Sequence, residues 1–216
     1  MRRYLLPILF TCAFAASAAE STRLVSGGAS QLVLQGSSNV APWRCSGRTI
    51  DGRMEVAAPL SRINNVIDRI EDGNVAMLTA QTASFPQPTF RLKVPVNTIR
   101  CGNRQMERDM YEALRSDAHP MIEFQFAELV GGINHDIDHG SYRAKIAGTL
   151  SLAGARKNVS VDVEAQRIAR DRFRLKARLP LRMTDFRITP PTALFGMVKA
   201  KDELIVHFDL ILQENP

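Results

Sequence analysis

The sequence lacks several patterns on which enzymes and cofactor proteins depend. It has three cysteines in 216 residues and no C-x-x-C pair, which excludes the metal and redox motifs built on that spacing. It has no Gly-rich phosphate loop. Ser151 lies in the segment GTLSLAG rather than in the G-x-S-x-G turn of a hydrolase. We therefore expect no enzymatic activity and no cofactor.

The sequence also lacks an apolar run of about 18 residues, the length that a membrane-spanning helix needs. The shorter run Leu5–Ala16 follows Arg2 and Arg3 and precedes small residues that suit cleavage, a pattern typical of a signal peptide. A buried N-terminal helix is the alternative. We expect residues 1–19 to be a signal peptide, residues 20–216 to form a single domain, and the protein to be periplasmic or secreted.

The charge of the chain is only mildly basic. Without Arg2 and Arg3, 26 of the 28 Lys and Arg residues remain against 22 Asp and Glu residues, a net charge of about +4. Such a small and dispersed excess suits contact with anionic surfaces but does not predict nucleic-acid binding. We therefore expect no nucleic-acid partner.

Two cysteines, Cys45 and Cys101, remain after the signal peptide. An even number of cysteines in an exported protein favours a disulfide, and two buried free thiols are the alternative. Trp43 shares a face with Cys45 if residues 40–46 are extended. It would then pack beside the disulfide, line a ligand cavity, or do both.

Alternating apolar and polar residues dominate the rest of the chain. In FRLKARLPLR (residues 173–182) every second residue is apolar, and nearly all the others are cations, which predicts a strand with one dry face. The fold class that we expect is an all-β antiparallel barrel of about eight strands, with a sandwich as the alternative. Further strands are expected within Gln31–Val40, Arg53–Ala58, Val75–Thr82, Phe90–Val96, Ile122–Phe126, Ala144–Leu152, Val159–Gln166 and Leu204–Leu212.

Two segments have a helical period instead. Ser61–Gly73 places isoleucine and valine at i, i+3, i+4 and i+7, with Ser61 as the expected N-cap. Asn103–Ser116 places Met106, Met110 and Leu114 on one face, with Asn103 as the expected N-cap. We expect both helices to cover apolar surface at a barrel mouth.

Two polar features have structural and functional interpretations. His135 and His139, with two aspartates between them, could ligate a metal, but a solvated hairpin loop explains the segment, so we expect no metal site. The cations that alternate along residues 172–182 are expected to form a solvated outer face that discourages edge pairing. Transient contact with an anionic membrane surface is the alternative. This basic stripe consists of Arg172, Arg174, Lys176, Arg178 and Arg182.

Five segments, in order, resemble motifs of the YceI-like lipid/polyisoprenoid-binding family. The resemblance covers about Gln31 to Gln213. The segments are Gly36–Cys45 (GSSNVAPWRC), Cys101–Asn103 with Met106, Asp109 and Met110, Ala113–Arg115 followed by His119–Phe124, Gly148–Gly154 with Lys157 and Val159, and Met183–Phe186 with Pro190 and Pro191.

The resemblance implies a lipocalin-like barrel whose interior holds a long apolar chain, commonly an isoprenoid lipid, with no catalytic residues. We therefore expect a secreted or periplasmic, non-catalytic binding protein for an amphiphilic or isoprenoid lipid. The alternatives are a structural or stress-related envelope protein with a filled barrel that acts through its outer surface, and a metal-dependent hydrolase using the two histidines. The expected ligand contacts are Trp43, Met106, Met110, Phe124, Phe126, Leu150, Leu175, Leu179, Phe186, Val206 and Phe208, with Leu114, Ile122 and Leu204 beside them.

Overall fold

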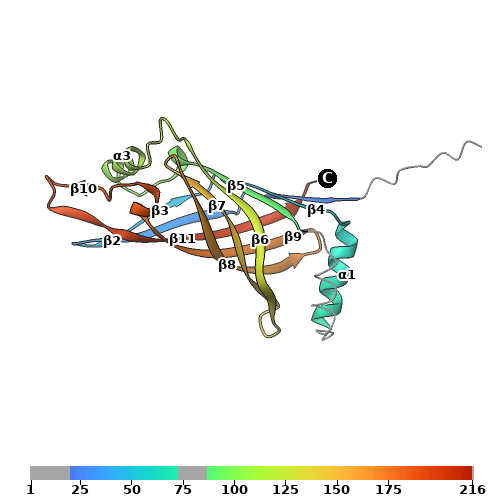
Figure 1. The fold of residues 1–216 in the computed structure, drawn as a ribbon. Helices are drawn as coiled ribbons and strands as arrows, with labels where there is room; N and C mark the ends of the chain where they lie inside the picture. The colour runs from blue at the N-terminus through green and yellow to red at the C-terminus, as the bar shows by residue number, and fades with distance from the viewer. Residues whose placement is uncertain (1–19, 73–86, 216) are drawn as a thin grey trace, which may run out of the picture.

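The computed structural model describes residues 20–72 and 87–215 (Figure 1). The described part consists mostly of strands, with one helix near each end of the molecule. The elements are β1 (Thr22–Ser26), β2 (Gln31–Ser38), β3 (Pro42–Gly47), β4 (Asp51–Val56), α1 (Leu60–Glu71), β5 (Thr89–Pro95), the 3-10 turn η1 (Val96–Thr98), α3 (Arg104–Ala113), β6 (Met121–Asp136), β7 (Ser141–Leu152), β8 (Ala155–Ala169), β9 (Arg172–Arg182), the 3-10 turn η2 (Met183–Phe186), β10 (Thr192–Ala193) and β11 (Val198–Glu214).

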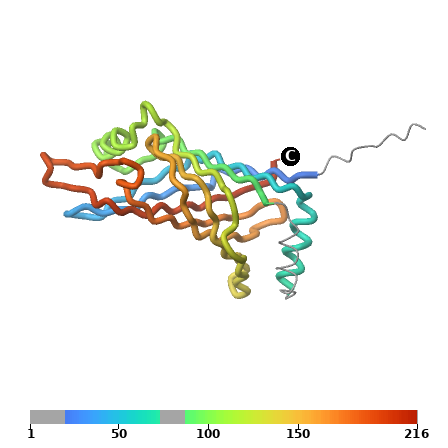
Figure 2. The backbone as a smooth tube through the Cα atoms, viewed as in Figure 1, coloured from blue at the N-terminus to red at the C-terminus, as the bar shows by residue number. Residues whose placement is uncertain are grey.

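Eight strands close into an antiparallel barrel, as the sequence predicted. The ring runs β1-β4-β5-β6-β7-β8-β9-β11, and the end of β11 pairs with β1, with Leu212 opposite Ser26. The earlier part of β11 pairs with β2, which in turn pairs with β3. These two strands therefore extend the wall beyond the closed ring (Figures 1 and 2).

The stretch of strictest alternation forms β9. Its apolar residues face the interior, where Leu179 is buried, and it pairs with β11 along its whole length. Pairing with β8 ends at Arg178. Pro180 lacks an N–H group, and it lies in the part of β9 that has no second neighbouring strand among the described residues, where a missing donor costs little.

The expected elements agree with the structure in type but not always in extent. Strand β1 was not expected, β2 ends at Ser38, and β8 runs from Ala155 to Ala169. The segment Val75–Thr82 lies outside the described residues. The helix expected in Asn103–Ser116 is confirmed as α3. The side chain of its N-cap, Asn103, accepts hydrogen bonds from the backbone amides of Gln105 and Met106.

The expected N-cap of the first helix is wrong. Helix α1 begins at Leu60, and its N-cap is Pro59, which makes no side-chain capping bond. The carbonyl of Pro59 accepts the first hydrogen bonds of the helix, from the amides of Arg62 and Ile63. Ser61 is therefore already inside the first turn. None of the helices in the described residues is long and apolar enough to cross a membrane.

The predicted disulfide between Cys45 and Cys101 is confirmed. It joins β3 to the segment that leads into α3, and Ser46 and Arg100 form a backbone bridge beside it. The cross-link spans 56 residues of sequence, and closing a loop of that size stabilises the folded state by about 4 kcal/mol in the chain-entropy model. It fastens the outer strand of the wall extension to the helix above it.

Candidate functional site

A cavity of about 540 Å³ lies at one end of the molecule, between the extension made by β2 and β3 and the helix α3. Its walls come from β2, β3, β6, β7, β9 and β11, and its cover comes from α3, η2 and the segment around β10. Helix α1 lies at the opposite end of the barrel (Figure 1). The two helices therefore lie at opposite ends of the molecule, and of the two only α3 covers the cavity.

Strand register places apolar side chains in rows across the cavity wall. Leu179 of β9 is opposite Val206 of β11, and Val206 is opposite Leu34 of β2. The next row towards the end joins Leu181, Leu204, Gly36 and Trp43. Because side chains alternate across a sheet, pairs in register present the same face, and the two rows make a continuous apolar surface.

The absence of a side chain at Gly36 allows Trp43 to lie flat in this wall. A Cβ atom at residue 36 would come within 2.1 Å of the indole ring. The indole Nε1 of Trp43 is buried and has no hydrogen-bond partner among the described residues. The ring is therefore held by packing over Gly36, and its face contributes to the apolar lining.

Helix α3 is fixed over the cavity by contacts at both of its ends. Asn103 Oδ1 accepts a hydrogen bond from the Gln105 amide at 2.8 Å, and Glu107 Oε1 accepts one from the Cys101 amide at 3.0 Å. Just past the C-terminal end, Arg115 donates to the carbonyl of Ala153 in the β7–β8 turn. Met106 and Met110 then line the cavity from above, where their flexible side chains can adapt to different shapes.

The turn η2 brings Met183 and Phe186 into the lining and is held by Asp202. The carboxylate of Asp202 accepts bonds from the Thr184 hydroxyl at 2.7 Å and the Thr184 amide at 2.8 Å. These bonds, together with the Arg182 guanidinium, hold the pKa of Asp202 below its ordinary value. Asp202 therefore stays ionised around neutral pH, and Arg182, which borders the cavity, is already paired with it.

Eight of the eleven expected ligand contacts lie in the cavity lining. They come from six elements, β3, α3, β7, β9, η2 and β11, and the structure brings them together around one space. The eight are Trp43, Met106, Met110, Leu150, Leu179, Phe186, Val206 and Phe208, and the neighbouring Leu114, Ile122 and Leu204 join them. That any of them contacts a ligand stays a prediction.

Phe124, Phe126 and Leu175 do not line the cavity. Phe124 lies across Gly148, where a Cβ atom would come within 2.4 Å of its ring, and it packs against Phe90 with the ring centroids 6.4 Å apart. Leu175 is four residues from Leu179, about 13 Å further along β9. These three residues belong to the packed core of the barrel, so the interior is filled in one part and hollow in another.

Two contributions to the cavity were not expected from the sequence. Leu34 and Leu32 of β2 line it, although the segment had been recognised only as a strand. Ala193, Leu194 and Val198, around the start of β11, also border it. The alternation of QLVLQ would have assigned the leucines to the inner face, but no local signal places the β10–β11 hairpin at the cavity.

The two histidines of the expected hairpin point to different surroundings. His135 lies in β6, where its ring stacks on Tyr142 with the centroids 4.6 Å apart. His139 is in the turn, with Nδ1 3.0 Å from Asp136 Oδ1. Within residues 20–72 and 87–215, no three His, Cys, Asp or Glu side chains gather closely enough to hold a metal ion. Burial raises the pKa of Tyr142 to about 12, so its hydroxyl is neutral at physiological pH.

The basic stripe faces outward, and most of its charge is neutralised. Arg174 bonds both oxygens of Asp209, at 2.7 and 2.5 Å, and this holds the pKa of Asp209 below its usual value. Lys176 pairs with Glu164 at 3.9 Å, and Arg182 with Asp202 at 3.1 Å.

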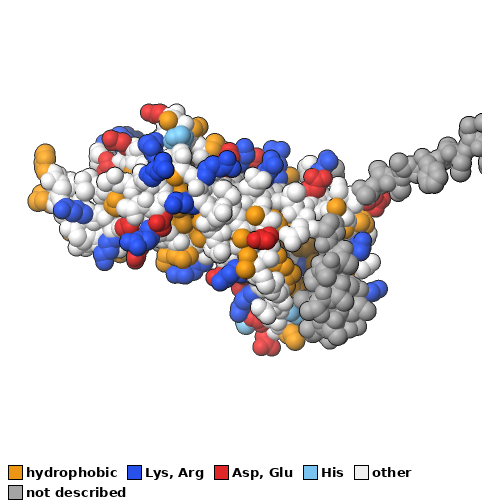
Figure 3. All heavy atoms as spheres, viewed as in Figure 1, with side chains coloured by type: hydrophobic (Ala, Val, Ile, Leu, Met, Phe, Trp, Pro, Cys, Tyr) orange, Lys and Arg blue, Asp and Glu red, His pale blue; other side chains and the backbone are white. Residues whose placement is uncertain are grey.

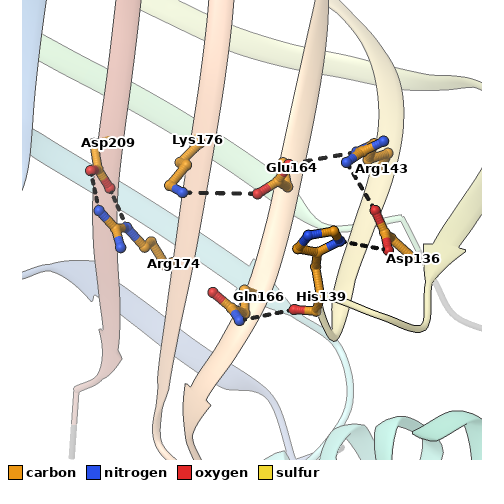
Figure 4. Close-up of polar contacts among 8 residues, drawn as sticks. All are labelled: Asp136, His139, Arg143, Glu164, Gln166, Arg174, Lys176 and Asp209. Atoms are coloured by element: carbon orange, nitrogen blue, oxygen red, sulfur yellow. Dashed lines mark hydrogen bonds and ion pairs between the residues drawn. The ribbon is translucent and has the colours of Figure 1, made fainter.

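The Lys176–Glu164 pair belongs to a network of ion pairs on this outer face, and the Arg174–Asp209 pair lies beside it (Figure 4). From Glu164 the network continues through Arg143 to Asp136 and His139. The register of β6, β7, β8, β9 and β11 sets acids opposite bases along this outer face. Little unpaired charge is left there for binding an anionic partner.

A comparison with family models matches residues 49–212, most of the chain, to the YceI-like domain. The chain belongs to the YceI-like domain family. The resemblance noted in the sequence is thereby confirmed, although the segment Gly36–Cys45 precedes the matched range. No curated protein matches the chain.

Several solved structures resemble this chain in fold, including two that cover most of its length. A polyisoprenoid binding domain from Saccharophagus degradans, implicated in plant cell wall breakdown, superposes with a TM-score of 0.60 over 91% of this chain and 100% of that one, at 11% identity. BcnA from Burkholderia cenocepacia superposes with a TM-score of 0.57 over 84% of this chain and 95% of that one, at 13% identity. At these identities the likeness establishes the fold alone.

Proposed function

We propose that this YceI-like protein is a non-catalytic, secreted or periplasmic carrier that holds an isoprenoid or similar amphiphilic lipid in the cavity beneath α3. The observation that carries the proposal is the cavity itself, about 540 Å³ with a wall of leucine, valine, methionine and aromatic side chains. Its size falls within the range of small-molecule sites. The polyisoprenoid-binding role of the Saccharophagus degradans domain supports the same ligand class.

The chemistry of the lining favours an uncharged chain over a polar substrate. Of the described residues that border the cavity, the charged ones are Asp109 and Arg182, and each is already bonded to a neighbour. No histidine is among them, and Cys45 is in the disulfide. The cavity wall is therefore suited to burying an apolar ligand rather than to proton transfer or nucleophilic attack.

Burial of an apolar chain would supply enough free energy for useful affinity. Each methylene removed from water contributes about 0.8 kcal/mol, so ten of them contribute about 8 kcal/mol. That corresponds to a Kd of about 1 μM before the cost of immobilising the chain is subtracted. A longer lipid can gain more only if its remaining carbons also lie against the apolar rim.

The fluorescence of Trp43 offers a direct test, because it is the only tryptophan of the chain and lies in the cavity wall. A brominated farnesol should quench this fluorescence saturably, since bromine quenches an indole on contact, and unlabelled farnesol should reverse the effect. The competitor is the control for collisional quenching. Quenching that is linear in concentration and unaffected by farnesol would contradict the proposal and favour the filled-barrel envelope protein.

A further inference from the structure

Exposed apolar side chains gather at the end of the molecule that contains the cavity. Four of them form what we call the apolar tip, one from the β2–β3 turn and three from the β10–β11 hairpin. Figure 3 shows hydrophobic side chains at the extreme of this end. The members and their exposed fractions are Val40 66%, Leu194 64%, Phe195 107% and Met197 67%.

The apolar tip is held in place by a specific set of hydrogen bonds. Asn39 Nδ2 donates to the Met197 carbonyl at 2.8 Å, and the Lys199 amide donates to Asn39 Oδ1 at 2.8 Å. The Asn39 amide also donates to the Lys199 carbonyl at 3.0 Å. One asparagine therefore joins the two segments, so that their apolar residues form a single surface.

The backbone of the hairpin keeps apolar residues where small polar ones are usual. Leu194 and Phe195 have φ angles of 50° and 56°, a left-handed conformation that favours Gly, Asn and Asp. A non-glycine residue in this conformation costs on the order of 1 kcal/mol. The chain accepts this cost at two successive residues while leaving both side chains in water, which points to a partner that the tip meets.

The surface of the tip is continuous with the cavity. Val40 and Leu194 border the cavity and are also exposed at the tip. A ligand that leaves the cavity at this end passes directly onto the tip. We therefore expect the tip to face a surface that can accept an apolar chain.

The positive charge of the two segments that form the tip indicates which kind of surface it meets. Residues 38–44 and 187–201 contain no acidic residue, and their exposed cations are Arg44, Arg187, Lys199 and Lys201. Each cation near an anionic bilayer contributes about 1 kcal/mol, and an apolar side chain that leaves water contributes about 1.5 to 3 kcal/mol. Apolar anchors with exposed cations on the same segments fit an anionic membrane surface.

We propose that the apolar tip inserts into the interface of an anionic lipid bilayer and places the cavity mouth against it, so that lipid is exchanged without crossing water. The biological role of this docking rests on the proposed lipid-carrier function. Phe195 and Met197 of the tip do not line the cavity, so docking and ligand binding can be tested independently.

Vesicle co-sedimentation of the mature protein tests the proposal. The protein should bind vesicles of phosphatidylcholine with one quarter phosphatidylglycerol, and binding should weaken with added salt because the attraction is partly electrostatic. The variant Phe195→Ser/Met197→Ser should partition at least ten-fold less, since neither residue lines the cavity but both lie at the tip. The matched control is Ile137→Ser/Ile168→Ser, which removes exposed apolar side chains elsewhere and should leave binding unchanged.

Two further measurements separate the possible outcomes. Farnesol binding in solution should be the same for the tip variant and the wild type, so a tip variant that loses vesicles but keeps farnesol supports docking. A wild type that binds neither farnesol nor a vesicle overturns docking together with the carrier function, and one that binds farnesol but ignores vesicles overturns docking alone. Sedimentation equilibrium that shows a dimer dissociated by Phe195→Ser/Met197→Ser, with no vesicle binding, would assign the tip to self-association instead.

Discussion

Ala113→Trp is expected to abolish farnesol binding, or to weaken it at least ten-fold, while leaving the barrel folded. Ala113 is the last residue of α3 and faces the cavity, where an indole would occupy space now available to a ligand. A buried tryptophan covers on the order of 200 Å², comparable with a substantial part of a small lipid. The change adds volume to an existing space, so the surrounding core need not be rearranged.

Isothermal titration calorimetry with farnesol measures this effect without depending on the fluorescence of Trp43. The matched control is Ala127→Trp, at an exposed residue of β6 that does not line the cavity, and its affinity should equal that of the wild type. Thermal unfolding of both variants checks that they remain folded. Unchanged affinity in a folded Ala113→Trp protein would place the ligand somewhere other than beneath α3.

Cys45→Ala/Cys101→Ala is expected to lower the free energy of unfolding by about 4 kcal/mol, the contribution of a cross-link that spans 56 residues. The loss should also free α3 from β3, because the disulfide is the covalent connection between them. Urea denaturation followed by circular dichroism gives the stability difference. Farnesol affinity should fall together with it, because the cover of the cavity would be less firmly held.

Reduction of the wild-type protein is the control for the alanine substitutions. The reduced protein should be destabilised by a similar amount, which would show that the cross-link rather than the buried sulfur volume is responsible. A stability change below about 1 kcal/mol in both proteins would mean that the disulfide contributes at the low end of the known range. The proposed role of the disulfide in fixing α3 would then be wrong.

The fold could be predicted from the sequence because alternation reports the face of each strand. The residues of β9 and β11 that were expected to point inward do so, and their strands are neighbours. Strand β1 was missed because five residues offer too short a pattern. The barrel closes through this short strand, so the ring itself was inferred from the number of strands and from family resemblance rather than from β1.

The candidate site could be predicted only in part, because alternation reports the face of a residue and not its depth along the barrel. Leu175 and Leu179 share the inner face of β9, but only Leu179 reaches the cavity. Phe124 is turned towards Phe90 by the space that Gly148 leaves, and no pattern within β6 reveals that contact. Likewise, the apolar residues of the β10–β11 hairpin resemble a buried strand in sequence, yet the protruding hairpin exposes them.

The central claim, that the cavity holds an apolar lipid, is tested most directly by the lipid that the protein itself carries. The chain would be expressed in full, purified without detergent and extracted with organic solvent, and the extract would be analysed by mass spectrometry. The account predicts an isoprenoid or similar lipid in stoichiometric amount from the wild type and a much smaller amount from Ala113→Trp. An extract with no lipid above that of Ala113→Trp, and no uptake of added isoprenoid, would contradict it.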